Sequence, residues 1–343
     1  MKEENVIKLP LIDDPCLVQE EMEKHLIKEA FHYSISIVED IDSTNEALKK
    51  RAREKGAKES AKKGAQENTQ GSEMEGLVPP VEVLAALHQS AGKGRRGRSF
   101  YSPKGTGLYL SFLLRPQLKA EQTLRITTMA AVAVAMAIEK VSGKEVKIKW
   151  VNDLFVNGKK IVGILTEAGF SGEKARRSAA ATEGAAESAG GPNPEGAAQK
   201  AAALTLDYAV LGIGINLWEP EEGFPEEIRQ IAGAINIPVP EELSPEEKTA
   251  YRNRLRGQLL AEVINEIARL YPQVFQEDHR EYMEEYRKRS LVLHQKVTLF
   301  TPDHQALNEE VLVEDIGEEA ELVVRSASGQ LRRVLSGEVS VRL

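Results

Sequence analysis

The sequence predicts an α+β fold with a small all-β domain at its C-terminus. Apolar strands and helical stretches follow one another without the strict alternation of a doubly wound parallel sheet, which favours a mixed, largely antiparallel sheet with helices. The pattern changes at Ser290, where helical sequence gives way to short strands separated by turns. We therefore expect an N-terminal extension at residues 1–30, a main domain at 31–289 and a C-terminal domain at 290–343.

The N-terminal part offers one helix and then a polar segment. Residues 14–26 (DPCLVQEEMEKHL) read as the helix, which leaves no room for a helix-turn-helix domain. In residues 41–48 (IDSTNEAL), Asp42 or Ser43 can cap a second helix, and Ser43 has capping-box spacing to Glu46. Capping alone would explain this segment.

The middle of the chain contains strands and one long helix. Residues 108–114 (LYLSFLL) form an apolar run typical of a buried strand, and residues 122–141 have helical character. Residues 145–151 (EVKIKWV) alternate as a half-buried strand does. Asn157-Gly158, between LFV and KKIVGILTEA, predicts a tight hairpin because both of its turn residues need positive φ.

The later elements divide into helices and short strands. Residues 203–217 (ALTLDYAVLGIGINL) supply one or two strands, and residues 246–288 are helical in pattern. The predicted strand segments of a C-terminal barrel are 291–300, 309–317, 320–329 and 332–343.

Two segments differ in composition from the rest of the chain. Residues 52–76 contain no Val, Ile, Leu or aromatic residue, and residues 171–202 are an Ala/Gly/Ser/Glu mixture that also lacks large apolar side chains. Such segments bury too little apolar surface to offset the entropy of ordering. We expect two mobile insertions that carry no chemistry.

Composition narrows the class of protein. The net charge of −8 disfavours a protein whose main task is to wrap a nucleic-acid backbone. Cys16 is the only cysteine, so neither an internal disulfide nor a cysteine zinc cluster can form. The start of the chain is charged and proline-interrupted, unlike a signal peptide, and the apolar run MAAVAVAMAI is too short to span a bilayer. We expect a cytoplasmic protein without membrane partners.

One basic loop stands out in this acidic chain. Residues 88–98 (HQSAGKGRRGR) interleave three glycines with Lys93, Arg95, Arg96 and Arg98. Glycines permit close backbone approach and the cations can neutralise phosphate, so the loop suits a bound polyphosphate or acyl phosphate. The spacing is neither that of a Walker A loop nor that of a dinucleotide-binding helix start. By itself, the loop fits a solvated basic turn equally well.

The predicted hairpin at residues 149–165 (KWVNDLFVNGKKIVGIL) gathers complementary polar groups. Asn152 and Asp153 follow one strand, and the turn brings Lys159 and Lys160 back beside them. One face then offers a carboxylate, an amide and an ammonium. A capped hairpin with exposed lysines is the alternative interpretation.

Two further signals are weak. The glycines of residues 212–216 (GIGIN) would let another group lie against the backbone of an apolar strand. The six histidines are scattered and give neither a catalytic triad nor a histidine metal motif.

These motifs, in this order, resemble the biotin protein ligase family. The family pattern has STN, then Q-x-x-G-[RK]-G-R-x-x-R, KWPNDL with K-[IL]-x-G-I-L-x-E, G-[IA]-G-[IL]-N and a terminal G-E-[IV]-S-[VL]-R. The chain supplies STN at residues 43–45, Gln89 with GKGRRGR, KWVNDL with KKIVGILTE, GIGIN, and GEVSVR at residues 337–342.

The resemblance implies a catalytic domain related in fold to class II aminoacyl-tRNA synthetases and an SH3-like C-terminal barrel. It implies that biotin and ATP form biotinyl-5′-adenylate with release of pyrophosphate, with Mg²⁺ present. The biotinyl group then passes to one lysine of a biotin carboxyl carrier protein, of acetyl-CoA carboxylase or a related carboxylase. Neither DNA nor a membrane is an expected partner, and a homodimer is left open.

By resemblance, the site residues fall into three groups. The catalytic residues are Lys160, Arg95 and Asp153, and Asp153 would also bind Mg²⁺. The biotin-binding residues are Ser43, Thr44, Asn45, Gln89, Lys93, Gly94, Arg95, Lys160 and Gly163. The adenylate- or ATP-binding residues are Gly92, Lys93, Arg95, Arg96, Asn152, Asp153, Asn216 and Arg342.

The chain departs from the family pattern at three positions. Val151 replaces the usual proline of KWPND, Lys93 replaces the arginine of many members, and Phe100 stands where some have tryptophan. No DNA-binding domain is expected, and therefore no repressor activity.

Three alternatives stay open. The first is a lipoate or octanoyl ligase or transferase, which has a similar fold but lacks the basic loop and the terminal GEVSVR motif. The second is a nucleic-acid-binding protein that uses the loop as a basic arm. The third is a catalytically silent relative, against which the intact lysine and arginines argue.

Overall fold

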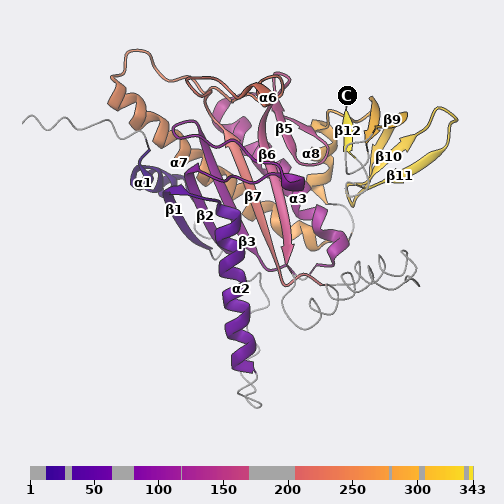
Figure 1. Ribbon diagram of the computed structural model, residues 1–343, viewed down its shortest axis with the longest axis horizontal. Helices are drawn as coiled ribbons and strands as arrows, with labels where there is room; N and C mark the ends of the chain where they lie inside the picture. Colours follow the sequence, from indigo (N-terminus) through magenta and orange to yellow (C-terminus); the bar gives the residue numbers. More distant parts are fainter. Residues whose placement is uncertain are drawn as a thin grey trace, which may run out of the picture.

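The computed structural model describes residues 13–27, 33–63, 81–116, 118–169, 205–277, 280–300, 306–335 and 340–342. Its strands form a seven-stranded sheet in the order β1-β2-β3-β7-β6-β5-β4 and a five-stranded sheet in the order β11-β10-β9-β8-β12 (Figure 1). The five-stranded sheet lies at the C-terminal end of the molecule, next to α8.

The helices and strands have the following bounds. The helices are α1 (Pro15–His25), α2 (Thr44–Lys63), α3 (Thr123–Ser142), α6 (Glu226–Arg229), α7 (Pro245–Leu270) and α8 (Glu281–Arg289), with 3₁₀ turns η1 (Arg95–Gly97), η2 (Ala120–Gln122) and η4 (Tyr271–Phe275). The large sheet has β1 (Tyr33–Ile41), β2 (Val81–Gln89), β3 (Gly107–Leu114), β4 (Lys147–Lys149), β5 (Asp153–Val156), β6 (Lys159–Gly169) and β7 (Tyr208–Asn216). The small sheet has β8 (Lys296–Phe300), β9 (Ala306–Ile316), β10 (Leu322–Arg325), β11 (Leu331–Val334) and β12 (Ser340–Arg342).

The large sheet is mixed, as the sequence predicts. Strands β1 and β2 are parallel, and every other neighbouring pair is antiparallel. The alternating residues of β3 serve two cores: Leu110 and Phe112 join the main cluster with α3 and α7, whereas Leu113 joins a second cluster beneath α2. Both faces of the central strands are therefore covered by helices.

The two long helices of the main core have clear start and stop signals. Helix α7 begins with a capping box between Ser244 and Glu247, with Pro245 in its first turn. Helix α3 ends at Gly143, which has a φ of 68°. The predicted hairpin is also confirmed, because Asn157 and Gly158 have φ of 50° and 75°.

The N-terminal helix is part of the main core. Val18 and Met22 of α1 are buried in the same cluster as the sheet and α7. Close packing of the two helices depends on Gly257, where an added Cβ would overlap the Val18 carbonyl oxygen. Residues 15–25 thus pack as an integral layer beside the domain that the sequence places at 31–289.

One predicted boundary is wrong. The expected insertion at 52–76 begins inside α2, which continues to Lys63, and Ala52 is only 1% exposed. Alanine has high helix propensity, and Ala52 lies one turn after Leu48 on the face that packs under the sheet. Residues 64–76 and the second expected insertion, 171–202, lie outside the described residues.

The five strands of the small sheet are all antiparallel to their neighbours. Their inward side chains, including Val297, Leu299, Val313 and Val324, are buried in continuity with the main core. The predicted run of short C-terminal strands is therefore confirmed. In the described part of the chain, no helix is long and apolar enough to span a membrane.

Candidate functional site

A cavity of about 400 Å³ lies where the large sheet, the basic loop and the small sheet meet. Its wall combines the turn between β1 and α2, the loop after β2, the hairpin strands β5 and β6, the middle of β7, and Phe300 of β8. Twelve of the sequence-predicted site residues line it: Ser43, Thr44, Asn45, Gln89, Lys93, Gly94, Arg95, Arg96, Asn152, Asp153, Lys160 and Gly163.

The STN segment forms a fixed polar wall. The Thr44 backbone N–H and hydroxyl both donate to Gln89 Oε1, at 2.9 and 3.1 Å. Asn45 Nδ2 donates to Glu167 Oε2 at 2.9 Å, while its Oδ1 lies 2.6 Å from the Ser111 hydroxyl. Each amide is thus oriented by a partner on another element, Gln89 by the start of α2 and Asn45 by β3 and β6, so the wall presents its remaining polar atoms in a defined direction.

Ser43 also has the capping role that the sequence allows. Its hydroxyl accepts a hydrogen bond from the Glu46 backbone N–H at 3.5 Å, at the start of α2. The Glu46 side chain points elsewhere, because its carboxylate pairs with Lys49 and Lys93 at 2.6 Å each. The cap therefore leaves this carboxylate available to hold the basic loop.

Glycines on β6 and β7 admit side chains against the sheet, as predicted for GIGIN. A Cβ at Gly212 would overlap Asn45 Oδ1. A Cβ at Gly214 or Gly163 would lie 2.6 or 2.9 Å from the Phe100 ring. Only glycine leaves room for these groups, so Phe100 rests across both strands at the centre of the cavity wall.

The basic loop is tightly folded. Gly94 N donates to the Arg98 carbonyl at 2.8 Å, and the backbones of Lys93 and Ser99 form an isolated antiparallel β-bridge. At its tip, Arg96 and Gly97 have positive φ of 56° and 72°. At its base, a Cβ on Gly92 would lie 2.5 Å from the Phe100 carbonyl oxygen, so this glycine is required by close approach.

The loop's cations face different partners. Lys93 pairs with Glu46 on α2, whereas Arg95 Nη1 donates to Asn152 Oδ1 at 2.9 Å. Burial lowers the pKa of Arg95, and the nearby charge of Arg96 lowers it further, while Asp153 opposes the shift. A partly desolvated guanidinium in such surroundings gains most from an anionic ligand.

The hairpin supplies the opposite side of the cavity. Lys160 Nζ lies 2.7 Å from Asp153 Oδ1, with both side chains 28% exposed. Asn152 Nδ2 donates to the Ile164 carbonyl at 2.7 Å, which turns its Oδ1 toward Arg95. Lys159 does not join this group, because its Nζ donates to the Gln230 carbonyl at 2.8 Å outside the hairpin.

Three predicted site residues are not brought to the cavity wall. Gly92 lies just behind it, at the base of the loop. Asn216 is buried at the end of β7, where its Nδ2 donates to the Gly233 carbonyl at 3.0 Å. The backbone of Arg342 lies in β12, paired with Thr298, but its side chain lies outside the described residues.

Sequence reasoning missed several lining residues. Lys149, Trp150, Phe155, Ile231 and Phe300 all line the cavity. Trp150 and Lys149 belong to the KWVND motif. The alternating pattern of that strand predicted only that Trp150 lies on its buried face and Lys149 on its exposed face. Phe300 carries no local signal, since it reaches the cavity from the other sheet.

The cavity has little capacity for a metal by itself. Among the described residues that line it, Asp153 is the one acidic side chain. The described part of the chain contains no group of three or more His, Cys, Asp or Glu side chains placed to hold an ion. A divalent cation here would need oxygen ligands from a substrate, as Mg²⁺ commonly does with phosphates.

Comparison with known proteins finds relatives whose names describe biotin ligases. Residues 76–179 match the biotin/lipoate A/B protein ligase family. "Bifunctional ligase/repressor BirA" of Bacillus subtilis is 32% identical over 159 residues, which cover 46% of this chain and 39% of that protein. "Biotin--[acetyl-CoA-carboxylase] ligase" of Mycobacterium tuberculosis is 24% identical over 240 residues, 68% of each chain. This chain therefore spans only 39% of the length of the Bacillus relative.

Solved structures share the fold. A mutant of the biotin protein ligase from Aquifex aeolicus, in complex with biotin, gives a TM-score of 0.57 at 22% identity, covering 90% of this chain and 98% of that one. The biotin protein ligase from the same organism with biotin and ATP gives a TM-score of 0.53 at 20% identity, with the same coverage. At such identities the likeness concerns the fold alone.

Proposed function

We propose that this chain, which carries a domain of the biotin/lipoate A/B protein ligase family, is an ATP-dependent biotin protein ligase. It would join biotin to ATP as biotinyl-5′-adenylate, release pyrophosphate and pass the biotinyl group to a carrier lysine. One observation carries the proposal: Lys93, Arg95 and Lys160 meet at a cavity whose other wall is the amide- and hydroxyl-rich STN and Gln89 cluster. The amide- and hydroxyl-rich wall suits the polar head of a small acid, and the cations suit a polyanionic co-substrate.

Adenylate formation needs positive charge where the carboxylate of the acid meets the α-phosphate of ATP. The carboxylate of the acid and the α-phosphate of ATP repel each other, and negative charge grows on phosphorus during the attack. Lys160 would screen both anions, and its ion pair with Asp153 at the cavity wall supports this role. Arg95 approaches from the loop side, held by Asn152.

The polar wall suits the ureido head of biotin. That bicycle is largely apolar apart from the two N–H groups and the carbonyl of its ureido ring, so its pocket needs a few aimed donors and acceptors. Ser43, Thr44, Asn45 and Gln89 would supply them. Gly163 leaves the space that the Phe100 ring occupies, and this ring gives the pocket an apolar side.

The basic loop would close over the adenylate. Gly92, Lys93, Gly94, Arg95 and Arg96 would surround the phosphate and keep water from the mixed anhydride. Transfer then requires an unprotonated carrier lysine aligned on the acyl carbon, because the acyl group is already activated. Asp153 would assist removal of the lysine proton.

Mg²⁺ would have one protein carboxylate as a ligand here. Asp153 would hold the ion together with phosphate oxygens of ATP, and the charge of the ion would help to neutralise pyrophosphate. Asn216 and Arg342 complete the proposed nucleotide residues. Asn216 would act through the Gly233 backbone that it holds, beside the start of the hairpin strand β6.

The finer fold assignments belong to the same proposal. The large sheet with its helices would be a class II aminoacyl-tRNA synthetase-like catalytic domain, and the small sheet an SH3-like barrel. We infer a biotin carboxyl carrier protein of acetyl-CoA carboxylase or a related carboxylase as partner, in the cytoplasm, with a homodimer left open. The cations of the loop face a cavity of about 400 Å³, which suits one small anion better than a DNA backbone.

A lipoate or octanoyl ligase is the second candidate, favoured by the joint family to which residues 76–179 match. The two are separated by offering the purified chain ATP, a carrier domain and biotin, lipoate or octanoate in competition. Mass spectrometry of the carrier lysine reads the result. Biotin should be attached in preference to both other acids, and preferential attachment of lipoate or octanoate would reject the proposal.

A further inference from the structure

We propose that the turn between β9 and β10, residues 317–321, is a positioning element for the KWVND segment of the site. The indole N–H of Trp150 donates to the Ala320 carbonyl at 2.7 Å in a buried setting, although the two residues are 170 positions apart. Trp150 lines the cavity and lies two and three positions before Asn152 and Asp153, which hold Arg95 and Lys160. The inference rests on the proposed function, because it assigns this turn a role in that reaction.

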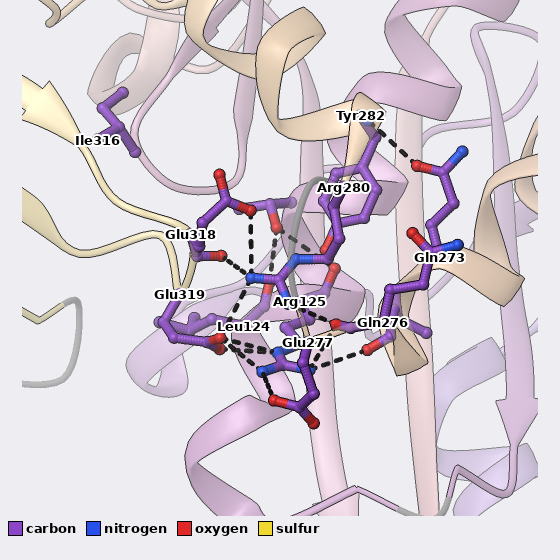
Figure 2. Close-up of polar contacts among 12 residues, drawn as sticks. Leu124, Arg125, Gln273, Gln276, Glu277, Arg280, Tyr282, Ile316, Glu318 and Glu319 are labelled. Carbon is purple, nitrogen blue, oxygen red and sulfur yellow. Dashed lines mark hydrogen bonds and ion pairs between the residues drawn. The ribbon is translucent and has the colours of Figure 1, made fainter.

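The turn is anchored by a fork of charge-assisted hydrogen bonds (Figure 2). Arg125 of α3 donates from Nε to Glu319 Oε2 at 2.8 Å and from Nη2 to Glu319 Oε1 at 2.6 Å. Its Nη1 donates to the Gln276 carbonyl at 3.2 Å. A bidentate pair of this kind fixes direction as well as distance.

A second arginine, at the start of α8, binds the same turn. Arg280 Nη2 donates to the Glu318 carbonyl at 2.6 Å and to Glu319 Oε1 at 3.2 Å. The side chains of Arg125 and Arg280 are 4% and 0% exposed. Glu319 is the carboxylate that these two deeply buried cations share, while Glu277 and Glu318 each lie within 3.6 Å of one of them. Removing the charge of Glu319 therefore takes the closest carboxylate from both arginines at once.

The KWVND segment is thereby held at two adjacent residues. Besides the bond from Trp150 to Ala320, the Tyr286 hydroxyl donates to the Val151 carbonyl at 3.1 Å. Burial raises the pKa of Tyr286, which keeps its hydroxyl protonated and able to donate. Tyr286 lies on α8, and Arg287 of the same helix donates to Glu318 Oε1 at 2.7 Å. The turn and α8 therefore form one support beneath the segment.

The support acts on catalysis through alignment. Asn152 directs Arg95 and Asp153 directs Lys160, so a shift of this backbone displaces both cations relative to the reacting phosphate. A displacement of about 1 Å in such groups costs about a hundredfold in rate. Glu319 touches no reacting atom, and it acts as a positioning residue.

The test substitutes the anchor and reads the segment directly. Glu319→Gln removes the charge at nearly constant shape, and Arg125→Lys keeps the charge but removes the fork, should the first variant not fold. Glu309→Gln is the matched control, because Glu309 of β9 forms a partly exposed ion pair with Arg332 of β11 in the same sheet. The chain has two tryptophans, so its indole N–H groups give two resonances that Trp150→Phe assigns.

We expect hydrogen exchange of the Trp150 indole N–H to accelerate about tenfold in Glu319→Gln, while that of Trp218 stays unchanged. In biotin-dependent pyrophosphate exchange, kcat should fall about tenfold with KM for biotin within about twofold. Glu309→Gln should match the wild type in both measurements. A Glu319→Gln variant with a lowered melting temperature but unchanged kcat and unchanged Trp150 exchange would overturn the proposal. If the wild type shows no biotin-dependent reaction, the proposed function fails, and Trp150 exchange alone still decides whether the turn holds the segment.

Discussion

The Lys160 ammonium lies 2.7 Å from the Asp153 carboxylate, across the hairpin that joins β5 and β6. A register shift in this pair of strands, next to Leu154 and Phe155, places Phe155 opposite Lys160. The ion pair holds the lysine charge at the cavity wall without burying it. An incoming carboxylate or phosphate can therefore reach Lys160 without displacing packed side chains.

Lys160→Ala should nearly abolish adenylate formation. Loss of one positioned charge at the reacting phosphate lowers the rate by about 10²–10³-fold. Single-turnover measurement of pyrophosphate release gives this rate. Lys159→Ala is the matched control, because the neighbouring ammonium bonds the Gln230 carbonyl outside the hairpin. Equal losses in the two variants would refute the role of Lys160.

Glu46→Gln should strengthen the binding of ATP. Glu46 holds Lys93 at 2.6 Å, so a phosphate must compete with this carboxylate for the lysine. Exposed ion pairs contribute up to about 1 kcal/mol, which corresponds to an affinity gain of up to about fivefold. Calorimetric titration with ATP measures it. Lys93→Gln should have the opposite effect, and weaker binding in both variants would contradict this competition.

Gly212→Ala should weaken biotin binding. Its Cβ would overlap Asn45 Oδ1, so the Asn45 amide must leave its place between Ser111 and Glu167. Overpacking of this kind costs about 1–3 kcal/mol, and we expect KM for biotin to rise about tenfold. Steady-state kinetics together with a melting curve test this. A lowered melting temperature with an unchanged KM for biotin would contradict the assignment of Asn45 to the biotin pocket.

The stability difference between wild type and Glu319→Gln should depend on pH. Burial raises the pKa of Glu319, but the hydrogen bonds and charges of Arg125 and Arg280 outweigh this and leave it lowered. A lowered folded-state pKa contributes stability above the unfolded-state value of about 4.3, and this stability is lost as the pH falls through the folded-state value. Urea unfolding should show the wild type more stable at pH 7, with the difference shrinking in acid. A difference that grows in acid would contradict the anchoring role.

Much of the fold can be predicted because it depends on local pattern. The apolar run at 108–114, the Asn157-Gly158 turn and the change at Ser290 each determine an element through their own residues. The predicted start of the insertion at residue 52 is wrong because the structure there depends on contacts that are distant in the sequence. Ala52 has no apolar bulk to mark it, and its burial depends on a strand face far away in the sequence.

The predicted site divides in the same way. The polar and charged residues of the STN, basic-loop and KWVND motifs can be found because their residue types carry the chemistry. Phe300 cannot, because it reaches the cavity from the small sheet, and Glu319 cannot, because it only anchors a turn that contacts Trp150. Neither residue belongs to a local motif. The partner of the Trp150 indole is likewise set only by the way the two sheets pack.

The most direct test of the central claim is biotin-dependent exchange of labelled pyrophosphate into ATP by the purified chain. This exchange reports reversible formation of the adenylate and needs no carrier protein. We expect exchange that saturates with biotin, that is absent without biotin and that is lost in Lys160→Ala. Exchange that does not depend on biotin would contradict the proposed reaction, and so would exchange at the wild-type rate in Lys160→Ala.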